Sequence, residues 1–217
     1  APEIVGTSLF GVFLNALSGT YAYVKQHRVY FKAAIPFAIA TLPGAILGSL
    51  VSDYFTGPTF SLSYGIFILI ISAIMYWNSS NKKAIATNFD ETLFIARKKL
   101  GIILSMFVGF ISSIFGIGGG IIHVPVMIYA LAFPPHMATA TSHFVLAVSS
   151  FMGVTSHIFL NHIVWIPALA VGFGAVIGAQ IGARLSKKTK PRSIILLLCI
   201  SLFLLGIRMI VESNLLF

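Results

Sequence analysis

The clearest candidate for binding an anion is a glycine-rich segment, Gly-Ile-Gly-Gly-Gly at positions 116–120, which interrupts the apolar region 101–133. When such a break opens a helix, the first backbone N–H groups are unpaired and the positive end of the helix dipole points at the break. Glycine also lets a ligand approach the backbone without a Cβ in the way. The alternative interpretation is a tight turn between packed helices. We expect substrate-binding positions at Gly116, Gly118, Gly119 and Gly120.

Hydroxyl side chains form the second candidate group. The dipeptide Thr141-Ser142 lies near the start of the apolar stretch that follows the glycines, and the same dipeptide, Thr7-Ser8, lies near the start of the first stretch. Hydroxyl groups can donate hydrogen bonds to an oxyanion without burying a full positive charge. The alternative is that they cap helices or bond to the carbonyl four residues earlier in their own helix. The repetition of the dipeptide favours substrate binding by all four side chains.

His143 and His123 are the only titratable groups that we expect near this site. His143 follows Ser142, and His123 lies just after the glycines. A neutral imidazole donates one hydrogen bond, whereas a protonated one adds charge and could couple anion movement to a proton. The alternative for each is a structural hydrogen bond to a neighbouring helix. The sequence shows no catalytic motif, no cofactor motif and no His-Cys-carboxylate cluster for a metal, so we do not expect an enzyme.

The composition indicates which elements must position these residues. The 217 residues are 58% hydrophobic and 9% charged, with a mean hydropathy of +0.98. A soluble domain carries about 25% charged residues, so most of this exterior must face lipid. A membrane-spanning helix needs about 20 apolar residues. Six stretches of this length predict an all-α polytopic membrane protein: 5–24, 30–51, 58–78, 137–160, 163–184 and 192–212.

The region 101–133 differs from these stretches, because the glycines divide it into apolar runs of 15 and 13 residues. At about 1.5 Å per residue, each run extends only about 20 Å. The hydrocarbon core of a bilayer is about 30 Å thick. We therefore predict a re-entrant hairpin of two half-helices, or of short tilted helices, with the glycines at its tip.

The sequence also contains an internal repeat. A shift of 134 positions aligns residues 7–52 with 141–186 without a gap. Chance alignment of apolar sequences matches Leu and Ile, but it rarely aligns a Thr-Ser pair and three glycines in one register. The matches in this register include Thr7-Ser8 with Thr141-Ser142, Phe10 with Phe144, Gly19 with Gly153, Gly44 with Gly178 and Gly48 with Gly182.

The net charge of +9 comes from short clusters of Lys and Arg between the apolar stretches. The cations do not form a stripe along one exposed face, which argues against nucleic acid as a partner. If the glycine hairpin enters and leaves on one side, 13 of the 14 Lys and Arg lie on that side, which is the cytoplasm by the positive-inside rule. The two repeats are then inverted, an arrangement typical of secondary transporters with a site at the midplane.

These features predict three regions. Residues 1–80 form the first repeat, 81–100 a basic cytoplasmic linker, and 101–217 the second repeat, which includes the glycine hairpin at 101–133. The first repeat lacks a glycine hairpin of its own. We therefore expect that the sequence represents a truncated or incomplete protein.

In their order and spacing, these elements resemble the TauE/SafE sulfite exporter family. The resemblance covers nearly the whole chain and rests on three features: the glycine segment with Pro125 after it, Ala140-Thr141-Ser142 in the next helix, and the helix with Gly178 and Gly182 that ends in Arg184-Leu185-Ser186. The family implies export or uptake of small sulfur-containing anions such as sulfite, thiosulfate, sulfoacetate or other organosulfonates. Its members usually carry the glycine hairpin in both halves.

We therefore expect a multi-pass secondary transporter of small sulfur oxyanions or organosulfonates in the inner membrane. Its partners are this substrate and membrane lipid, no cofactor is expected, and a homo-oligomer remains open. The alternative is an anion channel or a non-transporting membrane scaffold protein, in which the repeat serves packing alone.

Overall fold

The computed structural model describes residues 2–52, 58–80, 89–115 and 120–215. Every regular element in these ranges is an α-helix, and five of the helices (α2, α3, α6, α7 and α8) are long and apolar enough to cross a membrane. The prediction of an all-helical membrane protein is confirmed. The helices are α1 (Pro2–Lys25), α2 (Phe31–Ser52), α3 (Pro58–Ser80), α4 (Glu91–Phe115), α5 (Gly120–Tyr129), α6 (Pro135–Phe159), α7 (Trp165–Lys188) and α8 (Pro191–Leu215).

The predicted half-helix at 101–115 is wrong in length, because it is the second part of the 25-residue helix α4. The cations at 97–99 interrupt the apolar pattern, but they do not end the helix. Its start is fixed by Asp90, whose Oδ1 accepts hydrogen bonds from the backbone N–H groups of Thr92 (2.9 Å) and Leu93 (3.2 Å). These hydrogen bonds and that of the Thr92 hydroxyl lower the pKa of Asp90. Residues 91–100 of the predicted linker are therefore helical.

α5 has only 10 residues, so it extends about 15 Å and cannot cross the bilayer alone. The re-entrant hairpin stays a prediction, because residues 116–119 at its expected tip lie outside the described residues.

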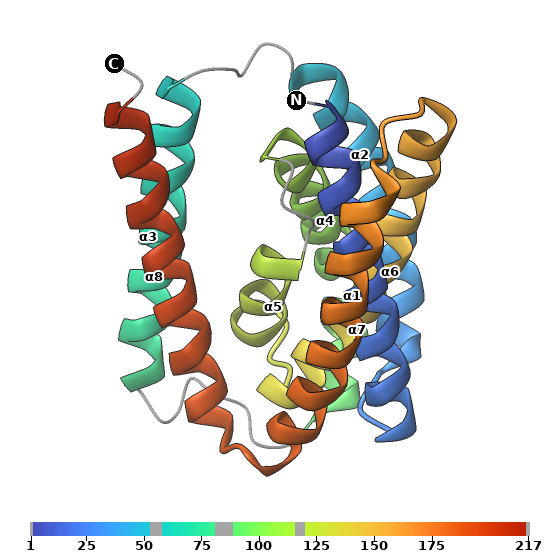
Figure 1. The fold of residues 1–217 in the computed structure, drawn as a ribbon. Helices are drawn as coiled ribbons and strands as arrows, with labels where there is room; N and C mark the ends of the chain where they lie inside the picture. The colour runs from blue at the N-terminus through green and yellow to red at the C-terminus, as the bar shows by residue number, and fades with distance from the viewer. Residues whose placement is uncertain (1, 53–57, 81–88, 116–119, 216–217) are drawn as a thin grey trace.

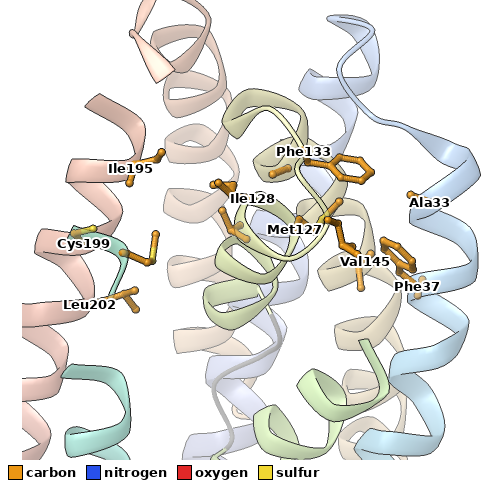
Figure 2. Close-up of a cluster of buried hydrophobic side chains, with 14 of the residues drawn as sticks. Ala33, Phe37, Met127, Ile128, Phe133, Val145, Ile195, Cys199 and Leu202 are labelled. Atoms are coloured by element: carbon orange, nitrogen blue, oxygen red, sulfur yellow. The ribbon is translucent and has the colours of Figure 1, made fainter. Parts of the chain in front are cut away.

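Figure 1 shows how the helices are arranged. α3 and α8 lie side by side and form one group, and α1, α2, α4, α6 and α7 form the other. α5 lies between the two groups. The largest buried cluster joins them through α5: Met127 and Ile128 lie between Cys199 on α8 and Phe37 on α2 (Figure 2). The short helix thus lies in the core of the protein.

α2 and α4 pack with their backbones in close contact. A Cβ added to Gly44 or Gly48 would overlap the carbonyl oxygen of Met106 or Phe110, and a Cβ added to Gly109 would overlap that of Thr41. Small residues allow this approach in membrane helices, where packing rather than the hydrophobic effect joins helices. At the other end of the pair, Lys32 and Glu91 form an ion pair of 2.6 Å.

α1 and α7 are joined differently, by polar side chains that bond to backbone carbonyls. Ser18 donates to Val176 (3.0 Å) and Gln26 to Ala183 (3.2 Å), while Gln180 donates back to the carbonyl of Ser18 (2.8 Å). In an apolar environment these hydrogen bonds satisfy groups that lipid cannot.

The two loops that follow the repeated Thr-Ser helices have the same backbone geometry. His27 and Asn161, which are 134 positions apart, both have φ of 55°, the left-handed conformation. The next amide in each loop bonds to the equivalent carbonyl: Arg28 to Tyr23 at 3.1 Å and His162 to His157 at 2.9 Å. The repeat found in the sequence thus has local structural counterparts.

Candidate functional site

A chain of hydrogen bonds through His123 connects three helices at the centre of the protein. Ser105 on α4 lies 2.9 Å from His123 Nε2, and Ser142 on α6 lies 3.3 Å from His123 Nδ1. All three side chains are at most 1% exposed, so their polar atoms depend on one another rather than on water.

The carbonyl oxygen of Gly101 fixes the direction of this chain. The Ser105 hydroxyl has a single proton and lies 2.7 Å from that oxygen, which can only accept. Ser105 therefore donates to Gly101 and accepts from the N–H at His123 Nε2. His123 Nδ1 is then the acceptor, and the Ser142 hydroxyl donates to it. In this state Ser142 has no proton left for an anion.

Ser112 is a further polar side chain that the sequence analysis did not single out. It lies on α4 one turn before the helix ends at Phe115, is 7% exposed, and its hydroxyl has no hydrogen-bond partner in the described structure. The signal in the sequence is its spacing from Ser105, because residues seven apart lie on one helix face. An unpaired buried hydroxyl carries a desolvation cost that a ligand can offset.

Gly120, the one candidate glycine within the described residues, begins α5. Its Cα hydrogen faces Leu146, which lies one turn beyond Ser142 on α6; an added Cβ would be 3.1 Å from Leu146 Cδ2. The start of α5 thus lies beside the segment that carries Ser142. Gly116, Gly118 and Gly119 lie outside the described residues.

His143 points away from His123, into the contact between α1 and α6. Its Nδ1 donates to the Thr139 carbonyl at 3.2 Å, and its ring packs edge-on against Tyr23 with centroids 5.3 Å apart. An added Cβ on Gly19 would lie 2.7 Å from His143 Cδ2. The symmetry-equivalent pair is Leu9 and Gly153, where an added Cβ on Gly153 would lie 2.7 Å from Leu9 Cδ2. His143 therefore occupies a packing position, although its Nε2 remains able to accept a proton.

The two predicted threonines make equivalent hydrogen bonds across the repeats. Thr141 Oγ1 accepts from the backbone N–H of Tyr30 at 3.2 Å, and Thr7 Oγ1 accepts from that of Val164 at 3.1 Å. Tyr30 and Val164 are also 134 positions apart, and each immediately precedes a helix. Each threonine thus anchors a loop of the opposite repeat, a structural role that leaves its own O–H free to donate.

The structure does not bring the two Thr-Ser pairs together. His143 lies beside Gly19, which is 12 residues beyond Thr7 on α1, so the pairs are about 18 Å apart along the helix axis. Ser142 is buried, whereas Ser8 is exposed. The expectation that four hydroxyls converge on one anion is therefore not met, and only Ser142 of the two serines lies in the buried chain with His123.

A second polar cluster lies at the end of the bundle where α1 ends and α6 begins. Arg28 in the α1–α2 loop contacts His136 Nδ1 and donates to Ser186 (3.1 Å) and Gln26 (2.9 Å). Its guanidinium also lies over the ring of Tyr23, 5.6 Å from the centroid. Burial lowers the pKa of Arg28, and Tyr23 acts in the opposite direction. No carboxylate within the described ranges pairs with this cation.

The site therefore offers hydroxyls, an imidazole and a helix N-terminus, which suit an anion. Across the described parts of the chain, no three His, Cys, Asp or Glu side chains are grouped to hold a metal ion. A groove of about 460 Å³ between α3 and α8 is lined mainly by apolar residues such as Leu69 and Phe203 and offers few donors.

The family model for the sulfite exporter TauE/SafE matches residues 1–209. The chain belongs to this family. The resemblance seen in the sequence is confirmed, and the family is one of membrane transporters rather than enzymes.

Curated relatives of this TauE/SafE protein carry similar names. The probable membrane transporter protein YunE of Bacillus subtilis is 35% identical, over 98% of this chain and 82% of that protein. The probable membrane transporter protein MJ0441 of Methanocaldococcus jannaschii is 29% identical, over 95% of this chain and 78% of that protein. A probable membrane transporter protein of Xylella fastidiosa strain Temecula1 is 27% identical, over 85% and 69%. No solved structure matches the chain.

Proposed function

We propose that this protein is a secondary transporter that moves small sulfur-containing anions, such as sulfite, thiosulfate or an organosulfonate, across the inner membrane. The family supports the chemical class of the substrate. The observation that carries the proposal is the buried hydrogen-bonded chain of Ser105, His123 and Ser142, with the start of α5 beside the segment of α6 that carries Ser142. The hydroxyl of Ser112, on the same helix as Ser105, adds a buried donor without a partner in the described structure.

This group can attract an anion without a fixed positive charge. The hydroxyl of Ser112 is a donor without a partner in the described structure, and the first amides of a helix such as α5 have no acceptor within their own helix. A helix N-terminus contributes about 0.3–2 kcal/mol toward a negative charge, and each hydrogen bond to a charged group about 1.5–3 kcal/mol. Several such donors together bind an anion firmly enough for selection and weakly enough for release.

His123 provides a means of coupling the anion to a proton. When Nδ1 gains a proton, it must donate to Ser142 instead of accepting from it. The Ser142 hydroxyl then turns its own proton outward, where it can bind the anion. Burial disfavours a charged imidazole unless a negative charge is near, so the proton and the anion favour each other's binding. The two would then move together.

Movement of one repeat against the other could expose such a site to each side of the membrane in turn. α1 begins and α8 ends at the same end of the bundle, marked N and C in Figure 1, so these helices run in opposite directions. Thr7 and Thr141 exchange equivalent bonds between the repeats. These features support inverted repeats, which move against each other in transporters of this type.

The Arg28 cluster fits the cytoplasmic mouth of this pathway. Its cation has no carboxylate partner in the described structure, and it lies at the end of the bundle that bears the basic clusters of 25–32 and 184–192. An excess of positive charge at an opening concentrates anions there.

The test is uptake by the purified protein in liposomes, measured with a panel of sulfite, thiosulfate, sulfoacetate, sulfate and chloride. We expect saturable uptake of at least one reduced or organic sulfur anion and little uptake of chloride. A protein that passes chloride as readily as the sulfur anions, without saturation, would be a channel, which was the alternative indicated by the sequence. Liposomes without flux for any anion would support the scaffold instead.

A further inference from the structure

Two histidines lie together where α6 ends and the loop to α7 begins. The ring centroids of His157 and His162 are 5.7 Å apart. The Nδ1 atom of each ring is buried and has no hydrogen-bond partner in the described structure. A buried polar nitrogen without a partner carries a desolvation cost that a ligand can offset. We call these two side chains the histidine pair.

The histidine pair is the repeat counterpart of the contact between Tyr23 and Arg28. His157 lies 134 positions after Tyr23, and His162 lies 134 positions after Arg28. The Arg28 guanidinium lies over the Tyr23 ring, 5.6 Å from its centroid, and the two imidazoles are in similar contact. One repeat therefore has a permanent cation at the position where the other has an imidazole, whose charge depends on pH.

The histidine pair and Arg28 lie at opposite ends of α1. Near the start of the helix, a Cβ added to Gly6 would overlap the carbonyl oxygen of His162 and lie 3.2 Å from His157 Nδ1. Arg28 lies just beyond Lys25, where the helix ends. The 24 residues of α1 extend about 36 Å, and the hydrocarbon core of a bilayer is about 30 Å thick. The two contacts are therefore far enough apart to lie at the two faces of the membrane.

The surroundings of the histidine pair carry little fixed charge. On α1, Glu3 lies one turn before Gly6 and is exposed. The Lys and Arg of α2 and α7 lie at the Arg28 end of the bundle, at Lys32 and from Arg184 onward, and α6 has none. No ion pair in the described ranges involves either imidazole. The charge at this end of the bundle therefore depends mainly on whether the imidazoles are protonated.

We propose that the histidine pair is an anion-binding site at the outer mouth of the transport pathway, which binds a small oxyanion when an imidazole is protonated and releases it when both are neutral. A protonated imidazole has an N–H donor at each nitrogen, so the unpartnered Nδ1 atoms supply hydrogen bonds to the anion. The inference rests on the proposed transport of anions and extends it. Arg28 attracts anions at the cytoplasmic mouth at any physiological pH, whereas the outer mouth attracts them only at acidic pH.

Titration of the histidines by NMR tests this site without a transport measurement. The purified full chain, with isotope-labelled histidine, is placed in lipid nanodiscs. The signals of the pair are identified by their loss in His157→Gln and His162→Gln. Titration midpoints are measured in thiosulfate and in chloride at equal ionic strength, because thiosulfate keeps its charge across the range in which histidine titrates. His27, an exposed histidine at the other end of α1, is the internal control.

We expect thiosulfate to raise the midpoint of at least one histidine of the pair by about half a pH unit or more, because a bound anion favours the protonated form. The midpoint of His27 should be the same in both salts. The proposal is overturned if the midpoints of the pair are equal in the two salts, or if neither imidazole titrates. Because no flux is measured, equal midpoints in a protein that transports thiosulfate would remove this site alone, whereas absence of flux with a raised midpoint would contradict the proposed function and keep the site.

Discussion

Two neighbouring buried hydroxyls, those of Thr141 and Ser142, have different hydrogen-bonding roles. Thr141 accepts a backbone hydrogen bond and anchors the α1–α2 loop. Ser142, the next residue, donates to His123 and can exchange that role for a bond to a ligand. Adjacent residues of similar chemistry thus serve stability in one case and, in the proposed mechanism, binding in the other.

The first prediction at this scale concerns Ser142→Ala. The substitution removes a donor to the anion, so the apparent KM for uptake should rise several-fold while the protein still inserts and folds. Ser149→Ala is the matched control, because the Ser149 hydroxyl bonds only to the Leu146 carbonyl of its own helix (3.1 Å). An unchanged KM for Ser142→Ala in folded protein would remove Ser142 from the site.

Thr141→Val should act on stability instead. It deprives the Tyr30 amide of its acceptor, and a buried polar group left without a partner costs about 1–3 kcal/mol. The melting temperature of Thr141→Val in detergent should therefore be lower than that of the wild type. Thr155→Val is the control and should lower the melting temperature less, because the Thr155 hydroxyl bonds to the Phe151 carbonyl of its own helix. A variant that keeps its melting temperature but loses substrate affinity would instead place Thr141 at the substrate.

At the scale of single residues, the sequence predicted the polar types but only part of their geometry. The sequence analysis expected Ser142 and His123 near one site, and the two side chains are in contact. The bonds of Thr7 and Thr141 were not, since they depend on how one repeat packs on the other. Ser112 was overlooked because the pair Ser112-Ser113 in an apolar helix matches no binding motif.

Among the helices, the pair α2 and α4 shows most directly what the glycines do. Their contact is a close approach of two backbones, which any side chain at Gly44 would block. The helices share this geometry with Gly-xxx-Gly pairs in membranes generally.

We predict that Gly44→Val destabilises the protein by about 1–3 kcal/mol or more, the usual cost of forcing extra atoms into a packed contact. Thermal unfolding in detergent measures the effect. Ala170→Val on α7 is the control, because Ala170 is exposed and the added methyl groups would face lipid. Equal melting temperatures for the two variants would show that α2 and α4 do not pack closely.

Element boundaries were predictable from the sequence wherever an apolar stretch has the length of a bilayer, as for α2, α3, α6, α7 and α8. α4 was predicted too short, because the cations at 97–99 look like the end of a membrane segment. They are tolerated where the helix leaves the hydrocarbon region: Arg97 donates to the Ala130 carbonyl at 2.9 Å, and long basic side chains reach the interface.

For the whole molecule, the repeat explains both the symmetric and the asymmetric features. The loops at His27 and Asn161 and the threonine bonds are the same in both halves. The central polar group belongs to the second repeat alone in the described structure, because α4 and α5 have no counterpart there. A transporter of the proposed kind needs the two halves to move against each other around that group.

The measurement that tests this account most directly is counterflow in proteoliposomes. Vesicles loaded with unlabelled sulfite or thiosulfate are diluted into the labelled anion at equal pH, and the transient accumulation of label is followed. We predict accumulation above equilibrium for the wild type. For His123→Gln, we predict that counterflow persists while uptake driven by a pH gradient is lost. Label that only equilibrates, with no overshoot, would contradict a transporter, and an intact response of His123→Gln to the pH gradient would contradict coupling through His123.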